Sequence, residues 1–142
     1  MMSYETLRFD QVQVGDELPP LEIPITTTLI VAGAIASRDF TPVHHDKAAA
    51  QAAGMQDVFM NILTTNGLVG RYVTDWAGMN AVLKGVAIKL GTPNLPGDTM
   101  KMSGRVTAKD EQEGVVEVSV VGSNSWGDHV TGTVRVALPK EN

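Results

Sequence analysis

The sequence predicts an α+β fold in which an antiparallel β-sheet wraps around one long helix. Residues 61–76 carry apolar side chains at helical spacing, over a longer stretch than any other helical segment. From residue 80 onward, apolar and polar side chains alternate instead, which is the period of half-buried strands. A sheet with one apolar face and an apolar helix can bury both surfaces by packing together.

The elements before the long helix are shorter. Residues 21–26 can form a strand, because Pro19 and Pro20 are expected to stop the preceding segment. A helix is predicted over residues 26–39, with one of the threonines at 26–28 as its N-cap. Several of its residues permit close packing, namely Leu29, Ile30, Gly33 and Ala34.

Asp46 can cap a second short helix over residues 47–53. The long helix then contains Gly67 and Gly70, and each interior glycine costs about 1 kcal/mol relative to alanine. This cost predicts that something approaches that face of the helix closely. Helix-to-sheet packing and room for a ligand are both compatible with it. Tyr72 and Trp76 are expected to belong to the core or to an interface.

Four strands are expected in the second half of the chain, over residues 81–90, 100–109, 115–123 and 129–138. Turn-forming sequences separate them at residues 94–98, 113–114 and 127–128. Because the strands follow one another along the chain, an antiparallel meander is predicted. His129, beside a Gly-Asp turn, is expected to be an exposed strand residue.

Composition and charge fit one domain over residues 1–142. The hydrophobic fraction of 43% and the charged fraction of 19% are those of an ordinary globular protein. A net charge of −5, without a cluster of Lys and Arg, argues against a nucleic-acid partner. No apolar run approaches the roughly 20 residues of a membrane helix, and the N-terminus is unlike a secretory signal. The absence of Cys excludes disulfides. A cytoplasmic location is expected.

The octet Asp-Phe-Thr-Pro-Val-His-His-Asp at residues 39–46 is the strongest candidate for chemistry. Pro42 prevents a continuous helix from Asp39 to His44, because it lacks a backbone donor and restricts the residue before it. The turn can bring a carboxylate and an imidazole to one point, where they could share a water molecule. From spacing alone, a purely structural turn stays an alternative. A metal site that includes His45 and Asp46 is another, but Asp46 is better explained as a helix cap, so no metal is expected.

These residues resemble the MaoC-like (hydratase-2) branch of the hotdog superfamily, whose signature is Asp-x-Asn-Pro-x-His-x-Asp/Glu. The resemblance continues into the central helix and into Leu-Pro-Gly-Asp-Thr at residues 95–99. The segments 38–46, 61–78 and 127–134 are similar to the small MaoC-like subunits of actinobacterial steroid side-chain enoyl-CoA hydratases. The resemblance implies a hotdog fold and hydration of a trans-2-enoyl-CoA, here a steroid side-chain thioester, to a (3R)-hydroxyacyl-CoA.

The resemblance also implies the roles of individual residues. Asp39 and His44 are the expected catalytic pair, and a backbone N–H of Asn61 or Ile62 is expected to bind the thioester oxygen. Three positions depart from the family pattern: Thr41 replaces Asn, Arg38 replaces a small residue, and Asn61-Ile62 replaces His-Gly. The basic residues that could contact coenzyme A phosphates are Arg38, Arg71, Lys84, Lys89 and Arg105.

The family resemblance implies no cofactor, because coenzyme A is part of the substrate. It implies a homodimer, or a heteromer with a second MaoC-like subunit, formed by pairing sheets edge to edge. Two other functions stay open: an acyl-CoA thioesterase on the same fold, and a non-catalytic subunit that binds acyl-CoA or supports assembly. The first would release thiol, whereas the second would keep its activity in the complex after Asp39→Asn.

Overall fold

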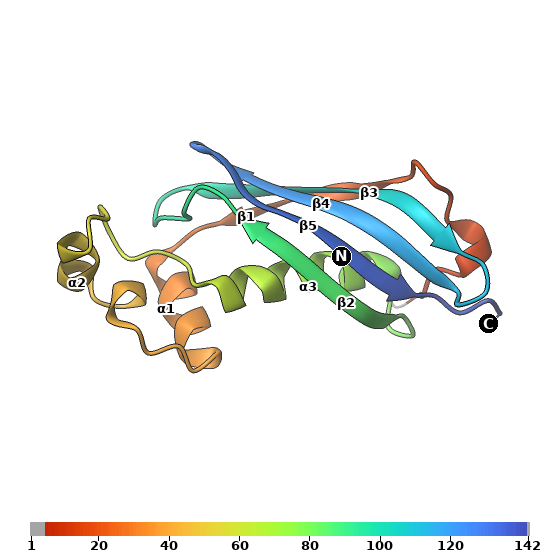
Figure 1. Ribbon diagram of the computed structural model, residues 1–142, viewed down its shortest axis with the longest axis horizontal. Coiled ribbons are helices and arrows are strands. Elements are labelled where there is room, and N and C mark those ends of the chain that lie inside the picture. The colour runs from red at the N-terminus through yellow and green to blue at the C-terminus, as the bar shows by residue number, and fades with distance from the viewer. Residues whose placement is uncertain (1–4, 142) are drawn as a thin grey trace.

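A computed structural model describes residues 5–141 and contains a five-stranded antiparallel sheet in the order β1-β3-β4-β5-β2. Its strands are β1 (Glu17–Pro24), β2 (Val82–Leu90), β3 (Thr99–Asp110), β4 (Val115–Asn124) and β5 (Gly127–Ala137). Its helices are α1 (Thr27–Ala36), α2 (Lys47–Ala52) and α3 (Ile62–Ala77), with short 3-10 turns at Phe9–Gln11 and Pro42–His44. Figure 1 shows α3 along one face of the sheet, whereas α1 and α2 extend beyond one end. The predicted hotdog arrangement is confirmed.

The central helix α3 forms where its apolar period and its end signals predict it. Asn61 is the N-cap and accepts a hydrogen bond from the Thr64 N–H, and Gly78 ends the helix with φ +104°. Val69 and Val73, four residues apart, are fully buried. They pack into a core with the inward-facing side chains of the strands, including Val118. The sheet therefore buries the apolar stripe of α3.

The strand order differs from the predicted meander. β3, β4 and β5 do pair in sequence, but β2 pairs with β5 instead of β3. The reason is the connection over residues 91–98, which is too long for a tight hairpin and carries the chain from β2 across to the other side of the sheet. β2 and β1 are consequently the two edges of the sheet.

The prediction that Pro19 and Pro20 stop the first segment is also wrong. Both lie inside β1, where the register with β3 shifts between Leu18 and Leu21. A proline is tolerated there because an edge strand with a bulge does not need every backbone donor. The strand therefore begins earlier than the predicted range of residues 21–26.

Helices α1 and α3 approach most closely at Gly33. A Cβ atom at this position would lie 2.2 Å from Thr64 Oγ1, so only glycine fits. The glycines within α3 do not have this function: Gly70 leaves ordinary contact distances to side chains of β2, and Gly67 faces open space. A glycine does permit a close approach to α3, but that glycine is Gly33 on α1 and not Gly67 or Gly70 on α3 itself.

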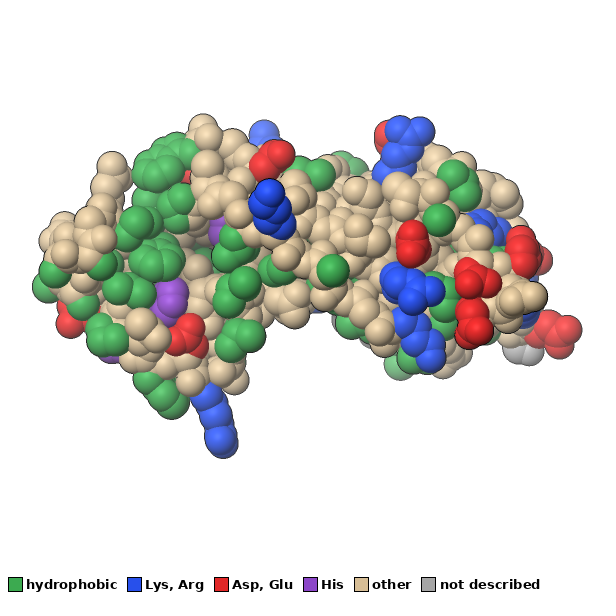
Figure 2. Space-filling view, viewed as in Figure 1, with side chains coloured by type: hydrophobic (Ala, Val, Ile, Leu, Met, Phe, Trp, Pro, Cys, Tyr) green, Lys and Arg blue, Asp and Glu red, His purple; other side chains and the backbone are tan. Residues whose placement is uncertain are grey.

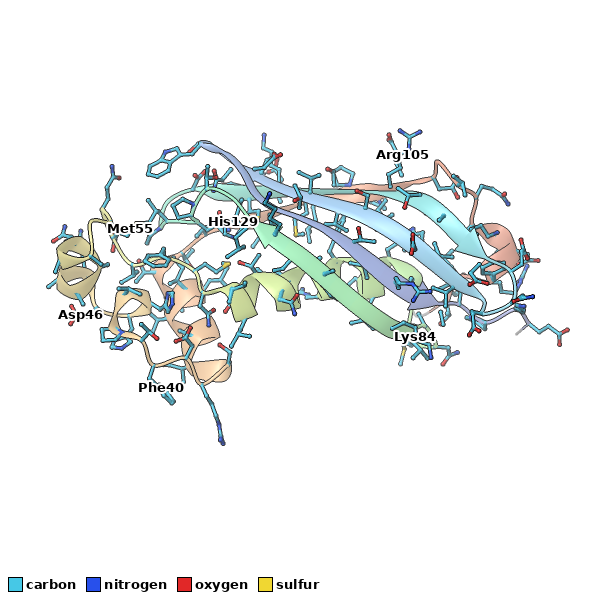
Figure 3. All side chains as sticks on the ribbon, in the orientation of Figure 1. Phe40, Asp46, Met55, Lys84, Arg105 and His129 are labelled. Carbon is cyan, nitrogen blue, oxygen red and sulfur yellow. The ribbon has the colours of Figure 1, made fainter. Side chains whose placement is uncertain are left out.

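The prediction for His129 is wrong, because its side chain is only 2% exposed. The residue lies on β5, at the end of the sheet nearest α1 and α2 (Figure 3). Tyr72 is buried in the core, and its hydroxyl donates to the Pro19 carbonyl over 2.8 Å. Trp76 is partly buried against the same core. Among residues 5–141, no helix is long and apolar enough to cross a membrane.

Candidate active site

The end of α1 places Asp39 at the surface of the domain. Arg38 has the left-handed backbone conformation, with φ +57°, and its N–H bonds to the Ile35 carbonyl over 3.0 Å. The Asp39 N–H bonds to the Ala34 carbonyl over 2.9 Å. Together these bonds form the reversed turn that ends many helices, usually with glycine at the position of Arg38. The turn directs the chain from α1 straight into the octet.

The proline turn then returns the chain toward Asp39. Pro42 begins a 3-10 turn that ends at His44, which is only 8% exposed. His44 Nε2 lies 3.4 Å from Asp39 Oδ2, so the predicted pair is brought together. On the opposite side of the ring, His44 Nδ1 lies 2.7 Å from the Phe59 carbonyl oxygen. The Phe59 ring packs edge-on against the imidazole, with the ring centroids 4.8 Å apart.

The contact with Phe59 decides which nitrogen of a neutral His44 carries the proton. A carbonyl oxygen only accepts, so Nδ1 must donate and Nε2 is left as an acceptor. The group that faces Nε2 is the Asp39 carboxylate, which also only accepts. A donor with two hydrogens, such as water, can satisfy both groups at once. The pair is therefore arranged to hold a water molecule and to expose the lone pairs of its oxygen.

Three hydrogen bonds fix the Asp39 carboxylate. The Thr41 hydroxyl donates to Oδ1 over 2.7 Å, and the Thr41 N–H donates to the same oxygen over 3.2 Å. The Asn61 side-chain amide donates to Oδ2 over 3.1 Å. The Thr41 hydroxyl and then the Asn61 amide lower the pKa of Asp39 below its ordinary value, and nearby His44 adds to the shift. The carboxylate is thus held in its ionised, accepting form.

Asn61 joins the start of α3 to this carboxylate. Its side chain is 1% exposed; its Oδ1 caps Thr64, and its Nδ2 also donates to Ser37 Oγ over 2.9 Å. Because the cap occupies the carbonyl end of the amide, the NH₂ end must face Asp39. The side chain of Asn61 therefore positions Asp39, whereas the sequence predicts a contribution only from a backbone N–H of Asn61 or Ile62.

The first turn of α3 also offers free backbone donors. A helix N-terminus leaves its first N–H groups without intrahelical acceptors. The cap of Asn61 takes the N–H of Thr64. Across the part of the chain that the structure describes, no protein acceptor bonds the N–H groups of Ile62 and Leu63. Both side chains are about half exposed, so this turn is open to a ligand. Ile62 therefore remains the candidate donor to a thioester oxygen.

Large hydrophobic side chains are exposed on the segments that carry Asp39 and Asn61. Four are exposed by half or more, namely Ile35, Phe40, Ile62 and Leu63. Figure 2 shows hydrophobic side chains gathered around histidines at the end of the molecule that contains α1 and α2. In Figure 3, Phe40 extends outward from this end, whereas Lys84 and Arg105 lie in the other half of the molecule. Of the basic residues singled out above, only Arg38 directly adjoins Asp39 in the chain.

The octet contains no arrangement suited to a metal ion. Asp46 Oδ1 accepts hydrogen bonds from the N–H groups of Ala48 and Ala49, so it caps α2 as predicted. His45 Nε2 lies 3.3 Å from the Phe40 carbonyl oxygen. Within residues 5–141, no three His, Asp or Glu side chains form a group that could hold a metal.

Sequence reasoning missed three contributors to the site: Ser37, Phe59 and Thr64. Ser37 accepts from Asn61, Phe59 orients His44, and Thr64 donates its N–H and its hydroxyl to the Asn61 side chain. Thr64 gave a partial signal, because it is the N3 residue after an asparagine that can act as a cap. Phe59 acts through its backbone carbonyl, which no side-chain pattern reveals.

Comparison with known proteins shows which family this chain is similar to. The family described as MaoC like domain matches residues 10–137. The 3-oxo-4,17-pregnadiene-20-carboxyl-CoA hydratase beta subunit of Mycobacterium tuberculosis is 50% identical over 125 residues, which cover 88% of this chain and 95% of that protein.

Two solved structures have a similar fold. The crystal structure of the ChsH1-ChsH2 complex from Mycobacterium tuberculosis matches with a TM-score of 0.86 and 49% identity, over 89% of this chain and 98% of that chain. The R-hydratase PhaJ1 of Pseudomonas aeruginosa has a TM-score of 0.84 at 21% identity, over 96% and 88% of the two chains, and thus shares the fold. From the family match and the 50% identical relative, the chain belongs to the MaoC-like domain family.

Proposed function

We propose that this chain is a 2-enoyl-CoA hydratase subunit that adds water to the double bond of a steroid side-chain CoA thioester. The product is a (3R)-hydroxyacyl-CoA. The observation that carries the proposal is the pair of facing acceptors, His44 Nε2 and Asp39 Oδ2, 3.4 Å apart. Hydration needs a water molecule whose hydrogens are held and whose oxygen can attack, which is what two facing acceptors provide.

In the proposed reaction, the water donates one hydrogen to Asp39 and the other to His44 Nε2. As the water oxygen bonds to C3 of the enoyl group, His44 removes a proton. The electron pair of the double bond moves toward the thioester carbonyl and forms an enolate. His44 then returns this proton to C2, the electron pair of the enolate forms the new C2–H bond, and the thioester carbonyl is restored, which completes the addition of water. Acid–base assistance of this kind is typically worth about 10²–10⁴ in rate.

The enolate oxygen is proposed to bind at the start of α3. The N–H of Ile62 is available there, and the positive end of the helix dipole favours a developing negative charge. Losing one donor to an oxyanion typically costs about 2.7–4 kcal/mol. Coenzyme A enters as part of the substrate, and the addition of water requires no further cofactor.

A steroid substrate is proposed from the relatives and from the surroundings of the site. The 50% identical relative is named as a hydratase of a pregnadiene-carboxyl-CoA, which is a steroid thioester. The exposed hydrophobic side chains around Asp39, especially Phe40 and Ile35, suit a large apolar acyl group more than a short one. The cytoplasmic location predicted above remains part of the proposal.

Assembly with a second MaoC-like subunit, or with a second copy, is proposed to occur through β2. The other edge of the sheet is β1, which Pro19, Pro20 and a bulge make unsuitable for pairing. β2 instead exposes Val82, Leu83 and Leu90 along an unpaired edge. The structurally similar chain comes from the ChsH1-ChsH2 complex. Light scattering is expected to show a dimer or larger assembly, and a strict monomer after mixing with such a subunit would contradict this part.

The test follows the absorbance of the enoyl thioester when the chain is added to a steroid side-chain enoyl-CoA or to a short-chain enoyl-CoA. Wild type is expected to remove the absorbance without releasing thiol, and to prefer the steroid substrate. Asp39→Asn is expected to abolish the reaction. The matched control is Asp46→Asn, which makes the same change seven positions later, at a helix cap that asparagine also fills well.

Two results would replace the proposal by its alternatives. Release of thiol in step with the loss of absorbance would identify a thioesterase. Full activity of Asp39→Asn, measured together with a MaoC-like partner, would identify a non-catalytic subunit. The same assay with the partner present also tests whether the chain works alone.

A further inference from the structure

Of the three histidines in this chain, His45 and His129 have no part in the proposed reaction, and His129 is nevertheless buried behind the site. We propose that His129 is a positioning residue for the hydration, acting through Thr65 on the first turn of α3. The inference rests on the proposed function, because that turn supplies Asn61 to Asp39 and the Ile62 N–H to the substrate.

The backbone around His129 fixes the ring in place. Its carbonyl accepts the Gly91 N–H over 2.7 Å, and the Thr92 N–H bonds to the Asp128 carbonyl over 2.9 Å. Only glycine fits at position 91, because a Cβ there would lie 2.2 Å from the Asp128 carbonyl oxygen. The segment of Gly91 and Thr92, which follows β2, therefore packs closely against β5. The imidazole of His129 lies between this segment and α3.

The two nitrogens of the His129 ring have different roles: one donates a hydrogen bond and the other accepts one. His129 Nδ1 lies 2.7 Å from the Thr92 carbonyl oxygen, so Nδ1 must donate. Burial lowers the pKa of His129, which keeps the ring neutral and leaves Nε2 as an acceptor. Thr65 Oγ1 lies 2.8 Å from Nε2, and its hydroxyl therefore donates to the ring. This contact joins β5 to α3 without a water molecule between them.

Thr65 connects this contact to the catalytic pair. It is fully buried, and its N–H donates to the Asn61 carbonyl over 3.2 Å, one helical turn earlier. On the other side of Asn61, the Met60 N–H bonds to the Asn94 carbonyl over 3.1 Å. Hydrogen bonds thus hold the backbone at Asn61 and at the residue before it, while the side chain of Asn61 donates to Asp39.

The position of the first turn of α3 matters because a displacement of about 1 Å at a reacting group can reduce the rate by about 10²-fold. Without the hydroxyl of Thr65, Nε2 of His129 would be buried without a donor, and the first turn of α3 could shift to relieve this. Asn61 would then bond less well to Asp39. The expected result is slower chemistry with little change in substrate binding.

The decisive comparison is Thr65→Val against Thr65→Ser, in the assembly in which the wild-type chain is active. Valine keeps the shape but removes the hydroxyl, whereas serine restores it. Thr65→Val is expected to lower kcat about tenfold, consistent with a sub-ångström displacement, and to leave KM nearly unchanged. Thr65→Ser is expected to retain most of the wild-type kcat. If the valine variant does not fold, Thr65→Ala replaces it.

A second readout does not depend on activity. The side-chain amide resonances of Asn61, observed by NMR, are expected to shift and to exchange faster in Thr65→Val and to be retained in Thr65→Ser. Unchanged resonances and an unchanged kcat in the valine variant would overturn the inference, and so would equal losses in both variants. If wild type hydrates no enoyl-CoA, the proposed function fails, while the resonances still decide whether His129 and Thr65 position Asn61.

Discussion

The sheet with α3 and the turn that carries Asp39 and His44 are built on different principles. The sheet and helix share an apolar core, in which valine side chains of β4 and β5 are completely buried. The turn lies at the surface and is held by hydrogen bonds that Thr41 and Asn61 donate to Asp39 and that His44 donates to the Phe59 carbonyl. The core depends on the total apolar area it buries, whereas the turn depends on where single donors and acceptors lie.

The two regions meet at the first turn of α3. On one side, this turn caps the helix and donates to Asp39 through Asn61; on the other, it packs into the core and bonds to β5 through Thr65. Mutations on the two sides should therefore separate stability from catalysis. A change that affects both is expected only where the regions touch.

The largest expected effect is on catalysis, from His44→Gln. Glutamine is polar but cannot take up a proton near neutral pH, so the hydration rate is expected to fall by about 10²–10⁴. The fold should persist, because the core is untouched. Enoyl-CoA absorbance and a urea titration measure the two quantities. His45→Gln, at the exposed neighbouring position, is the control, and a His44→Gln variant with more than half of the wild-type rate would contradict the assigned role.

The converse change is Met102→Ala on β3. Met102 is 1% exposed, and truncating a buried methionine typically costs about 2–5 kcal/mol of unfolding free energy. The rate per folded molecule is expected to stay near that of wild type. Lys101→Ala, on the exposed face of the same strand, should change stability by less than about 0.5 kcal/mol. If Met102→Ala slowed hydration as strongly as His44→Gln, the two regions would not be separable.

Gly33→Ala should affect both regions, because its Cβ would collide with Thr64 beside Asn61. Overpacking of this kind typically costs about 1–3 kcal/mol, and the displaced Thr64 would release the Asn61 side chain, so the rate should fall as well. Gly67→Ala is the matched control, since its Cβ would meet no atom within 4 Å and should stabilise the helix by up to about 1 kcal/mol. Equal stability of the two variants, measured by urea unfolding, would argue against the close contact.

The smallest expected effect is a shift in pH dependence, from Thr41→Val. Loss of the hydroxyl that lowers the pKa of Asp39 should raise that pKa toward the ordinary value of 3.8. The carboxylate must be ionised to hold water, so at the low pH where Asp39 titrates its ionised fraction should be smaller in the variant than in wild type. NMR titration of the Asp39 carboxyl carbon gives the pKa directly. Thr41→Ser keeps the hydroxyl and should behave as wild type, and an unchanged pKa in the valine variant would contradict the assignment.

The same shift has a consequence for stability. A carboxyl group whose pKa is lower in the folded state favours folding at pH values above its ordinary pKa. That contribution is lost as the pH falls through the lowered pKa. The acid unfolding of Thr41→Val should therefore begin at slightly higher pH than that of wild type.

The helix around Val69 and Val73 and the strands of the second half could be predicted from local sequence patterns. Hydrophobic period and turn residues act locally, and a period of 3.6 or 2 can be read without knowing the partner surface. The turn that carries Asp39 and His44 could also be predicted, because Pro42 excludes a continuous helix. The cap at Asp46 could be predicted for the same reason, since a cap involves only neighbouring residues.

The contacts between residues far apart in the chain could not be predicted in this way. The pairing of β2 with β5, the burial of His129 against Thr65, and the contact of Asn61 with Asp39 all join residues far apart in the chain. A polar residue on a strand has the same local pattern whether its side chain meets water or a buried threonine. The difference arises because a buried imidazole must find partners for both nitrogens, and only the packing of β5 onto α3 supplies them.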